Sequence, residues 1–186
     1  FEIAFTQLER NRISEYNFPT SLNGRREVEP AQDLLDAYEA NDERFEGSIA
    51  FEGTQAYAIK YDDLSLGADN FIVLRIADMY LVRAEAEANL PSPVVSAVQS
   101  DINEIRVRAN LQPTLESSIS QLIRIIEKER RIEFAFEGQR WFDLVRTDRA
   151  IAVLPNVNST NQTLFPIPTD EIQTNNSPGM VQNPGY

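Results

Sequence analysis

The chain carries, at residues 75–110, the sequence RIADMYLVRAEAEANLPSPVVSAVQSDINEIRVRAN. Apolar side chains recur in and just before this stretch at the spacing of an amphipathic helix, in two runs separated by Leu90-Pro91. The first run comprises Val73, Ala77, Tyr80, Leu81, Ala84 and Ala88, and the second comprises Val94, Val98, Ile102, Ile105 and Ala109. We therefore predict two helices. The first begins near Phe71 and ends before Pro91, because the residue preceding a proline avoids the helical conformation.

The connection between the two predicted helices is short. Ser92 can cap the free N–H groups of the second helix, and Pro93 suits its first turn. Helices joined by so few residues lie antiparallel. The pair has the size of a tetratricopeptide-type repeat, roughly 34 residues, and one clear copy is present. Because such a pair needs neighbours to bury both faces, we expect it to pack against helices outside this chain or against its own third helix.

A third helix is predicted from about Ser118 to Gly138, and Arg140–Arg146 is predicted as one more short helix. The apolar face of the third helix comprises Leu122, Ile125, Ile126, Ile132 and Phe136. Trp141, the only tryptophan, is interpreted as a packed side chain because such large rings favour burial.

The segment 1–70 is expected to be rich in loops. Alternating apolar and polar residues predict a short strand over Phe1–Phe5, followed by a long loop. A short helix is predicted over Pro30–Ala40, with Pro30 at the first helical position, where its missing N–H is not needed. Glycines and scattered aromatic residues over 45–70 predict short strands and loops.

Residues 151–186 are rich in Pro, Asn, Thr and Ser, and we predict an ordered coil wrapped on the helices. The predicted fold is therefore mainly α. It is a portion of a tetratricopeptide-like α/α superhelix with irregular loops, short strands and a wrapped carboxy-terminal coil. We expect one domain over 1–186, in which 71–150 supplies the helical repeat and its docking helices.

The composition excludes several functions. The formal net charge is −12, with 29 acidic and 17 basic residues, so neither nucleic acid nor an anionic membrane surface is an expected partner. The absence of Cys and His removes disulfides, zinc sites and Ser-His-Asp triads. Neither Asp62-Asp63 nor Asp42-Glu43 matches a calcium loop, so we predict no metal and no cofactor. The chain starts at Phe1 without a signal segment or long apolar span, so any membrane anchor is expected outside it.

Glu129, Glu133 and Glu137 follow one another at intervals of four residues along the third predicted helix. Two of them could act as the acid and base of a glycoside hydrolase. Alternatively, arginines could bind them in a network that docks this helix. Such arginines are available at Arg106, Arg108, Arg130, Arg140 and Arg146. We favour the network and predict no catalytic residue, because nearby guanidinium groups keep carboxylates ionised and a general acid must hold a proton.

The candidate ligand-binding residues lie in the segments expected to be irregular. Loops carry binding residues more often than packed helices do. Tyr16, Phe18 and Tyr57 offer aromatic rings for stacking on a sugar, while Arg12 and Asn17 can hydrogen-bond to its hydroxyl groups. The alternative for each aromatic residue is that it packs against its own loop.

Several motifs together resemble the SusD/RagB family. RIADMYLVRAEA at 75–86 and INEIRVRANL at 102–111 are similar to its repeat region, and ERRIEFAFEGQRWFDLVR at 129–146 to its most recognisable helix. FPIP at 165–168 and QNPGY at 182–186 resemble its closing coil. The resemblance covers roughly residues 30–186, in the order found in the family.

The resemblance implies a tetratricopeptide-like scaffold that belongs to a lipoprotein on the outer face of a Bacteroidetes-type outer membrane. It also implies non-catalytic capture of an oligosaccharide or polysaccharide and a partner, a TonB-dependent SusC-like transporter that imports the sugar. The lipid anchor is expected upstream of this chain. The matching motifs form the scaffold, so the resemblance carries over no binding residue. Two alternatives remain: a protein-interaction module without sugar binding, and the glycoside hydrolase.

Overall fold

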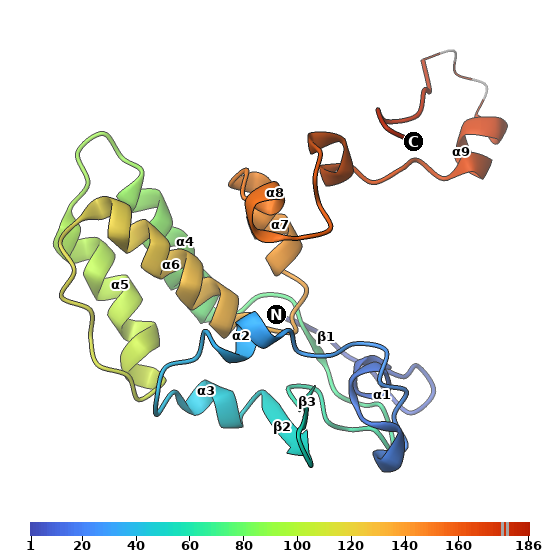
Figure 1. Cartoon of the computed structure of the whole chain (residues 1–186), viewed down its shortest axis with the longest axis horizontal. Coiled ribbons are helices and arrows are strands. Elements are labelled where there is room, and N and C mark those ends of the chain that lie inside the picture. The colour runs from blue at the N-terminus through green and yellow to red at the C-terminus, as the bar shows by residue number, and fades with distance from the viewer. Residues whose placement is uncertain (176, 178) are drawn as a thin grey trace. The chain divides into compact units, whose positions relative to one another are not determined.

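The computed structural model describes residues 1–175, 177 and 179–186. The chain divides into two compact units, Phe1–Gly138 and Gln139–Tyr186, and each is described by itself (Figure 1). The expectation of one domain over 1–186 stays a prediction. Helices dominate the described residues, and the strands are short, as the sequence predicts.

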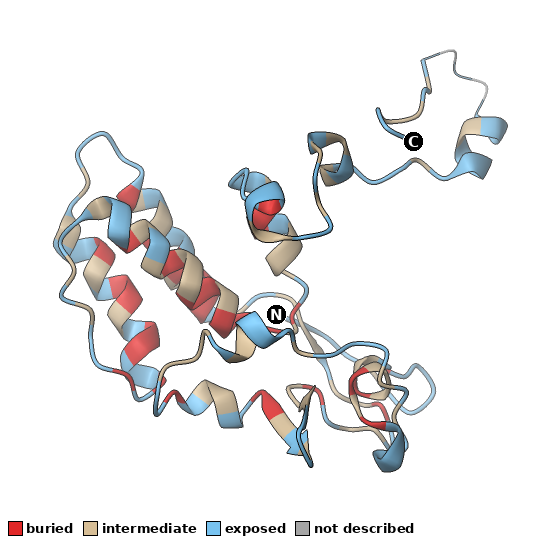
Figure 2. Cartoon of the chain, viewed as in Figure 1, coloured by how far each residue is buried: buried red, intermediate tan, exposed pale blue. Residues whose placement is uncertain are grey.

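Three helices form the core of the first unit: α4 (Ile76–Ala88), α5 (Val95–Arg108) and α6 (Ile119–Glu133). Each packs against the other two. Buried residues gather on their facing sides (Figure 2). The predicted packing of the pair on its own third helix is therefore confirmed, whereas packing on helices outside this chain stays a prediction.

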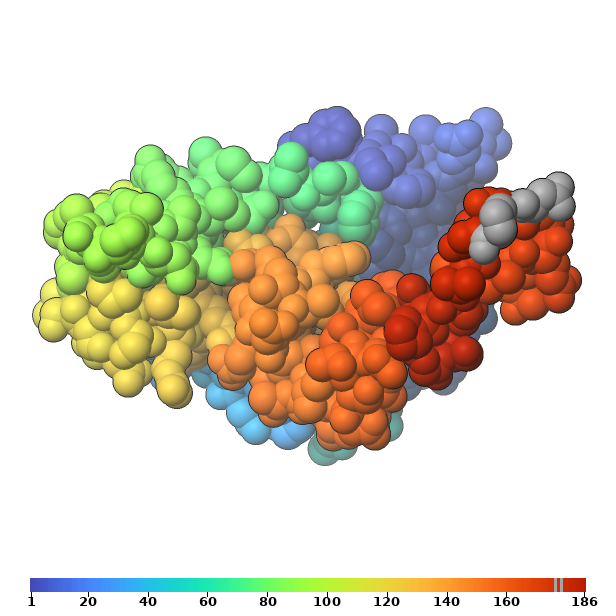
Figure 3. Space-filling model, turned by 90° about the horizontal axis from the view of Figure 1, so that it is seen from above, coloured from blue at the N-terminus to red at the C-terminus, as the bar shows by residue number. Residues whose placement is uncertain are grey.

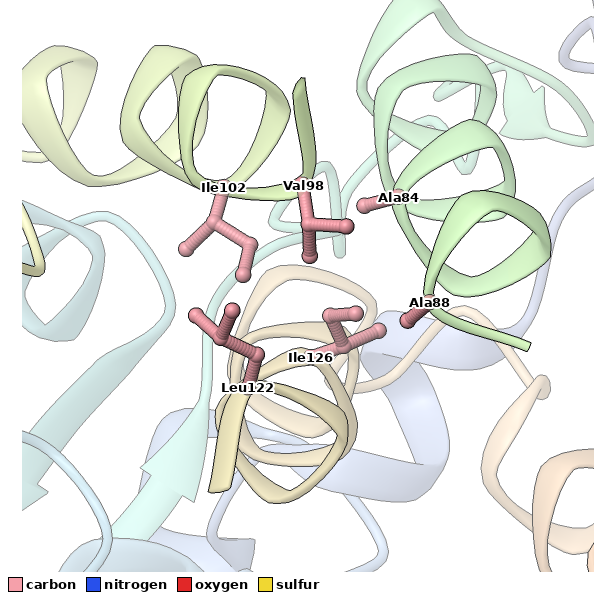
Figure 4. Packing of buried hydrophobic residues seen from close by; sticks show 6 residues of the cluster. All are labelled: Ala84, Ala88, Val98, Ile102, Leu122 and Ile126. Atoms are coloured by element: carbon pink, nitrogen blue, oxygen red, sulfur yellow. The ribbon is translucent and has the colours of Figure 1, made fainter. Parts of the chain in front are cut away.

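The centre of this three-helix core is apolar and tightly packed. Figure 4 shows side chains from the three helices pointing toward one another. They are Ala84 and Ala88 of α4, Val98 and Ile102 of α5, and Leu122 and Ile126 of α6. The two alanines let α5 and α6 approach α4 closely, and each fully buried aliphatic side chain stabilises the fold by about 1.5–3 kcal/mol.

In Figure 3 the light-green surface of α4 and α5 adjoins the yellow surface around residues 110–125. There the Asn103 Nδ2 atom donates to the Thr114 carbonyl at 3.2 Å.

The first core helix begins at Ile76, so the predicted start near Phe71 is wrong. Phe71–Ile72 is instead strand β4, which pairs antiparallel with β1 (Glu2–Ile3). The N–H groups of Val73 and Leu74 donate to the Phe1 carbonyl. The strand partner lies about 70 residues away in sequence, and local periodicity carries no information about it.

The second core helix begins at Val95, so the predicted cap at Ser92 is also wrong. Val94 occupies the N-cap position in an extended conformation. Its N–H donates to the Glu87 carboxylate at 2.7 Å. The end of α4 therefore fixes the connection, and the Ser92 hydroxyl does not.

The third core helix starts after Ser118, as predicted, but it ends at Glu133 instead of Gly138. Phe136 and Gly138 both have positive φ angles, 66° and 78°, which end the helical path. Phe134 is buried beneath the guanidinium groups of Arg75 and Arg130, which lie 4.9 and 5.1 Å from its ring centre. These contacts favour the turn over a continued helix.

The amino-terminal part of the first unit contains more helix than predicted. Helix α1 (Ile13–Asn17) and the 3-10 helix η1 (Thr20–Leu22) lie in the expected loop. Helix α2 is only Gln32–Leu35, so the prediction of Pro30–Ala40 is too long and Pro30 lies outside it. Short helices are marginal alone, and tertiary contacts set their extent.

The prediction of short strands and loops over 45–70 is confirmed. Helix α3 (Glu43–Glu46) is capped by the Asp42 carboxylate, which accepts the Arg44 N–H at 3.0 Å. It leads into the hairpin of β2 (Ile49–Glu52) and β3 (Gln55–Ala58).

The second unit contains the predicted helix α7 (Arg140–Arg146). The remainder is not only coil, because α8 (Ala150–Val153), the 3-10 helix η2 (Thr160–Thr163) and α9 (Thr169–Thr174) interrupt it. The start of η2 is held by the Ser159 hydroxyl, which accepts the Asn161 N–H. Trp141 is half-buried, with its ring centre 5.9 Å from that of Phe165. Wrapping of this segment on the core helices stays a prediction.

Candidate functional site

Two of the three aromatic candidates, Phe18 and Tyr57, come together where the end of α1 meets β3. The Phe18 and Tyr57 rings meet edge to face, with centres 5.1 Å apart. We call these two residues the Phe18–Tyr57 pair. Both side chains are half-buried, so each is held by packing and still presents surface to solvent. The prediction placed the two residues in separate loops, and the structure joins them in one contact.

Gly24 allows the backbone that holds Phe18. Its N–H donates to the Pro19 carbonyl at 2.9 Å. A Cβ atom on Gly24 would lie 2.1 Å from the Phe18 carbonyl oxygen. Any side chain at this position would therefore displace Phe18, which makes the glycine a positional requirement for the pair.

The other candidates lie on or beside α1 in different surroundings. Tyr16 is half-buried, and the Arg25 guanidinium lies 5.1 Å from its ring centre. Arg12 is exposed and lies 3.8 Å from the Glu15 carboxylate. Asn17 is only 4% exposed, so its amide is not open to a ligand in this conformation. The expectation that Tyr16 and Asn17 lie in a loop is wrong, because both belong to α1.

The three glutamates of the α6 region lie in a buried ion-pair network. Glu129 accepts hydrogen bonds from Arg44 Nη1 at 2.8 Å and Arg106 Nη1 at 2.6 Å. Glu133 pairs with Arg75, Arg108 and, at 3.4 Å, Arg44. The four guanidinium groups therefore converge on the carboxy-terminal end of α6.

Glu137 completes this network beyond the end of α6. It pairs with Lys60 at 2.7 Å and with Arg75 at 2.8 Å. The predicted roles of Arg106 and Arg108 are confirmed. Two other predicted partners bind elsewhere: Arg130 pairs with Asp78 at 2.9 Å, and Arg146 pairs with Asp143 at 2.8 Å.

This arrangement opposes a general-acid role for Glu133. Burial raises the pKa of the Glu133 carboxyl, but Arg75 and Arg108 outweigh it and hold the pKa below its usual range. A carboxyl that stays ionised cannot donate a proton to a leaving group. The network therefore docks α6 on α3, α4 and α5, as the structural interpretation of these residues predicts.

The first unit has two surface hollows that the sequence did not predict. The larger, of about 550 Å³, lies beside α3 and is lined by Tyr38, Asn41, Glu43, Phe45, Glu46 and Asn110, among others. The smaller, of about 240 Å³, is lined by Arg44, Lys60, Arg75, Arg108, Glu133 and Glu137, together with Gly47, Ser48 and Ile72. We call the smaller hollow the basic cleft. The larger hollow is lined almost entirely by residues 35–46, with Asn110 added from just after α5. The residues of the basic cleft come from distant parts of the sequence, so no local motif marks it.

Two further observations concern the described residues alone, 1–175, 177 and 179–186. None of the helices there combines the length and apolar character needed to cross a bilayer. No group of three or more His, Cys, Asp or Glu side chains there is placed to hold a metal ion.

Comparison with known sequences identifies one family. A model of the SusD family matches residues 52–154. The SusD-like protein P38 of Formosa agariphila is 34% identical over 137 residues, which cover 65% of this chain and 27% of that protein. The SusD-like protein P2 of the same organism is 33% identical over 133 residues, which cover 63% and 26%.

Solved structures agree with the sequence comparison. A SusD-like protein from Bacteroides fragilis matches with a TM-score of 0.79 at 23% identity, over 100% of this chain and 53% of the other. A laminarin-binding SusD-like protein matches with a TM-score of 0.77 at 27% identity, over 100% and 49%. The chain thus spans about a quarter of the length of the two curated relatives and about half of the two solved ones. The predicted tetratricopeptide-like helical fold is confirmed.

Proposed function

Since the chain belongs to the SusD family, we propose that it takes part in binding an oligosaccharide without catalysis and in delivering it to a TonB-dependent SusC-like transporter. The proposed place is the outer face of the outer membrane, with a lipid anchor outside this chain. A laminarin-binding protein among the similar structures supports the choice of a glycan as the ligand.

The observation that carries the binding proposal is the Phe18–Tyr57 pair. Sugars present apolar C–H faces next to hydroxyl groups, so a rigid aromatic surface beside hydrogen-bond donors suits them. Arg12 and Arg25 supply such donors at α1 and in the loop that follows it. The rings are already packed against each other, so binding does not require them to be ordered first.

Calorimetric titration of the protein with a panel of oligosaccharides tests this proposal. Tyr57→Ala should weaken the binding of a bound sugar by about 1–2 kcal/mol, the scale of a lost aromatic contact. Phe18→Ala should act similarly, because it removes the ring that supports Tyr57. Phe142→Ala is the matched control, since Phe142 is an aromatic residue of α7 that is 65% exposed and lies in the other unit.

Unchanged sugar affinity in both Tyr57→Ala and Phe18→Ala, with melting temperatures like that of the unaltered protein, would remove this pair from the binding site.

The hydrolase alternative is tested with a chromogenic glycoside. We expect no turnover by the protein or by Glu133→Gln, and turnover that disappears in Glu133→Gln would revive the alternative.

A further inference from the structure

The basic cleft combines four cations with two carboxylates. Arg44, Lys60, Arg75 and Arg108 line it together with Glu133 and Glu137. Its positive lining is unusual in this chain, whose formal net charge is −12. A concave, positively lined site attracts anions because low-dielectric walls focus its field.

The ion pairs around the cleft leave one positive charge in excess. They join six cations to five carboxylates in one connected network. The cations are Arg44, Lys60, Arg75, Arg106, Arg108 and Lys128, and the carboxylates are Glu39, Asp42, Glu129, Glu133 and Glu137. A single added anion would neutralise this network.

Arg108 is the cation best placed to receive that anion. Its side chain is 57% exposed, whereas the side chains of Arg44, Lys60 and Arg75 are largely covered. Among the described residues, only its Nη2 atom makes a hydrogen bond, to Glu133. Its remaining guanidinium N–H groups can therefore bind an oxyanion in the forked arrangement that arginine favours.

Lys60 supplies a second donor at the same cleft. Its Nζ atom donates to the Glu133 carbonyl at 2.9 Å and to the Glu137 carboxylate at 2.7 Å. An ammonium group has three protons, so one N–H is left for a ligand. The cleft volume of about 240 Å³ is below the roughly 300–1,000 Å³ of sites that enclose a whole small molecule, so it fits one charged substituent.

We propose that the basic cleft binds a single oxyanion substituent, a uronate carboxylate or a sulfate ester, of an acidic oligosaccharide. This inference rests on the proposed glycan-binding function and narrows its ligand to acidic sugars. Arg108 holds the substituent, Lys60 adds a hydrogen bond, and Arg44 and Arg75 keep the cleft positive.

The test is calorimetric titration with three oligosaccharides of equal length: trigalacturonate, a sulfated galactan trisaccharide and neutral galactotriose. The unaltered protein should bind at least one acidic probe more tightly than the neutral one, and the two acidic probes distinguish a carboxylate from a sulfate. Arg108→Gln should weaken acidic binding about tenfold, the scale of a charge-assisted hydrogen bond. It should leave neutral binding unchanged.

Arg83→Gln is the matched control, because it removes the same charge from an arginine that is 69% exposed and bound to Asp101, outside the cleft. An equal loss of affinity for the acidic probe in Arg108→Gln and Arg83→Gln would show that only the net charge of the protein matters, and it would overturn the proposal. Neutral and acidic probes bound equally would overturn it while leaving the glycan-binding function standing. No binding of any of the three probes would overturn the proposal, and the wider oligosaccharide panel then decides the glycan-binding function.

Hydrogen exchange on the unaltered protein keeps the test independent of how the Arg108 variant folds. The acidic probe that binds should slow exchange at the backbone amides of Gly47 and Ser48, which line the cleft. Protection confined to the Phe18–Tyr57 pair would place the acidic sugar elsewhere and refute the proposal.

Discussion

A buried carboxylate is stable only when cations and hydrogen-bond donors replace the water that it loses. Glu129 shows this condition most clearly, because it is fully buried between Arg44 and Arg106. Arg106 also binds Glu39 with two hydrogen bonds of 3.0 Å each. Arg106 thus serves two carboxylates and Arg44 serves three, so the network is a single structural unit.

Glu39 makes the stability of this unit depend on pH. Hydrogen bonding from Arg106 is the main cause that lowers the pKa of Glu39 from 4.5 to about 2, and Lys128 adds to it. The group binds protons less readily in the folded state, so its contribution is present above pH 4.5 and is lost as the pH falls toward 2. We predict that Glu39→Gln shows a smaller fall in melting temperature than the unaltered protein on going from about pH 5 to about pH 3.

Circular dichroism melts at the two pH values measure this effect. The control is Glu43→Gln, which removes an exposed carboxylate from the neighbouring helix α3 and should keep the full fall in melting temperature. An equal fall in Glu39→Gln and in the unaltered protein would contradict the assignment of acid sensitivity to the Glu39 pair with Arg106.

The sequence predicted the structural role of Glu129, Glu133 and Glu137 better than it predicted which arginines bind them. The spacing of the three glutamates and the arginines nearby in sequence were sufficient to favour an ion-pair network over a catalytic pair. Arg44 and Arg75 were not predicted as partners of these glutamates, because they lie 85 and 58 residues away in sequence from Glu129 and Glu133. The prediction of Asn17 as a ligand-binding residue rested on its amide group alone. Its burial depends on tertiary packing, which the residue type does not reveal.

At the scale of elements, the close packing of the core depends on alanine positions along α4. Ala84 is fully buried in the core cluster, where it faces Val98, and Ala86 on the same helix is exposed. We predict that Ala84→Leu destabilises the protein by about 1–3 kcal/mol, because extra methylene groups in a packed core force neighbouring side chains and backbone apart. Urea unfolding measures the change.

Ala86→Leu is the control for that prediction, because it makes the same substitution on the solvent side of the same helix. It should change stability by less than about 0.5 kcal/mol. If Ala84→Leu proved as mild as Ala86→Leu, α4 and α5 would have to be farther apart than the structure shows.

Helical periodicity located α4, α5 and α6 because each buries one face over at least three turns. It failed for elements that depend on distant partners. Strand β4 exists only through its pairing with β1, and α1 is too short to show a period. The sequence signals for the start of α5 and the end of α6 were likewise incomplete, because the Glu87 carboxylate and the Phe134 contacts act through space.

At the scale of the whole molecule, the family and the fold were predictable because scaffold motifs are spread over most of the chain. The matched family region, 52–154, includes the core helices and α7. The residues proposed to bind a ligand were not predictable to the same degree. The basic cleft gathers side chains from α3, α5, the end of α6, the loop at Lys60 and the residue just before α4, and only the folded chain brings them together.

Gly138 ends the first unit and precedes the second. Its φ angle is 78°, and a Cβ atom there would meet nothing within 4 Å. A substitution therefore costs free energy through the backbone alone, because L residues disfavour positive φ. We predict that Gly138→Ala lowers the free energy of unfolding by about 1 kcal/mol.

Gly47→Ala is the control and should lower the free energy of unfolding by less, since Gly47 has an ordinary helical φ of −78° and normal contacts. Urea unfolding compares the two, and equal stability losses would show that Gly138 does not hold the chain in this conformation.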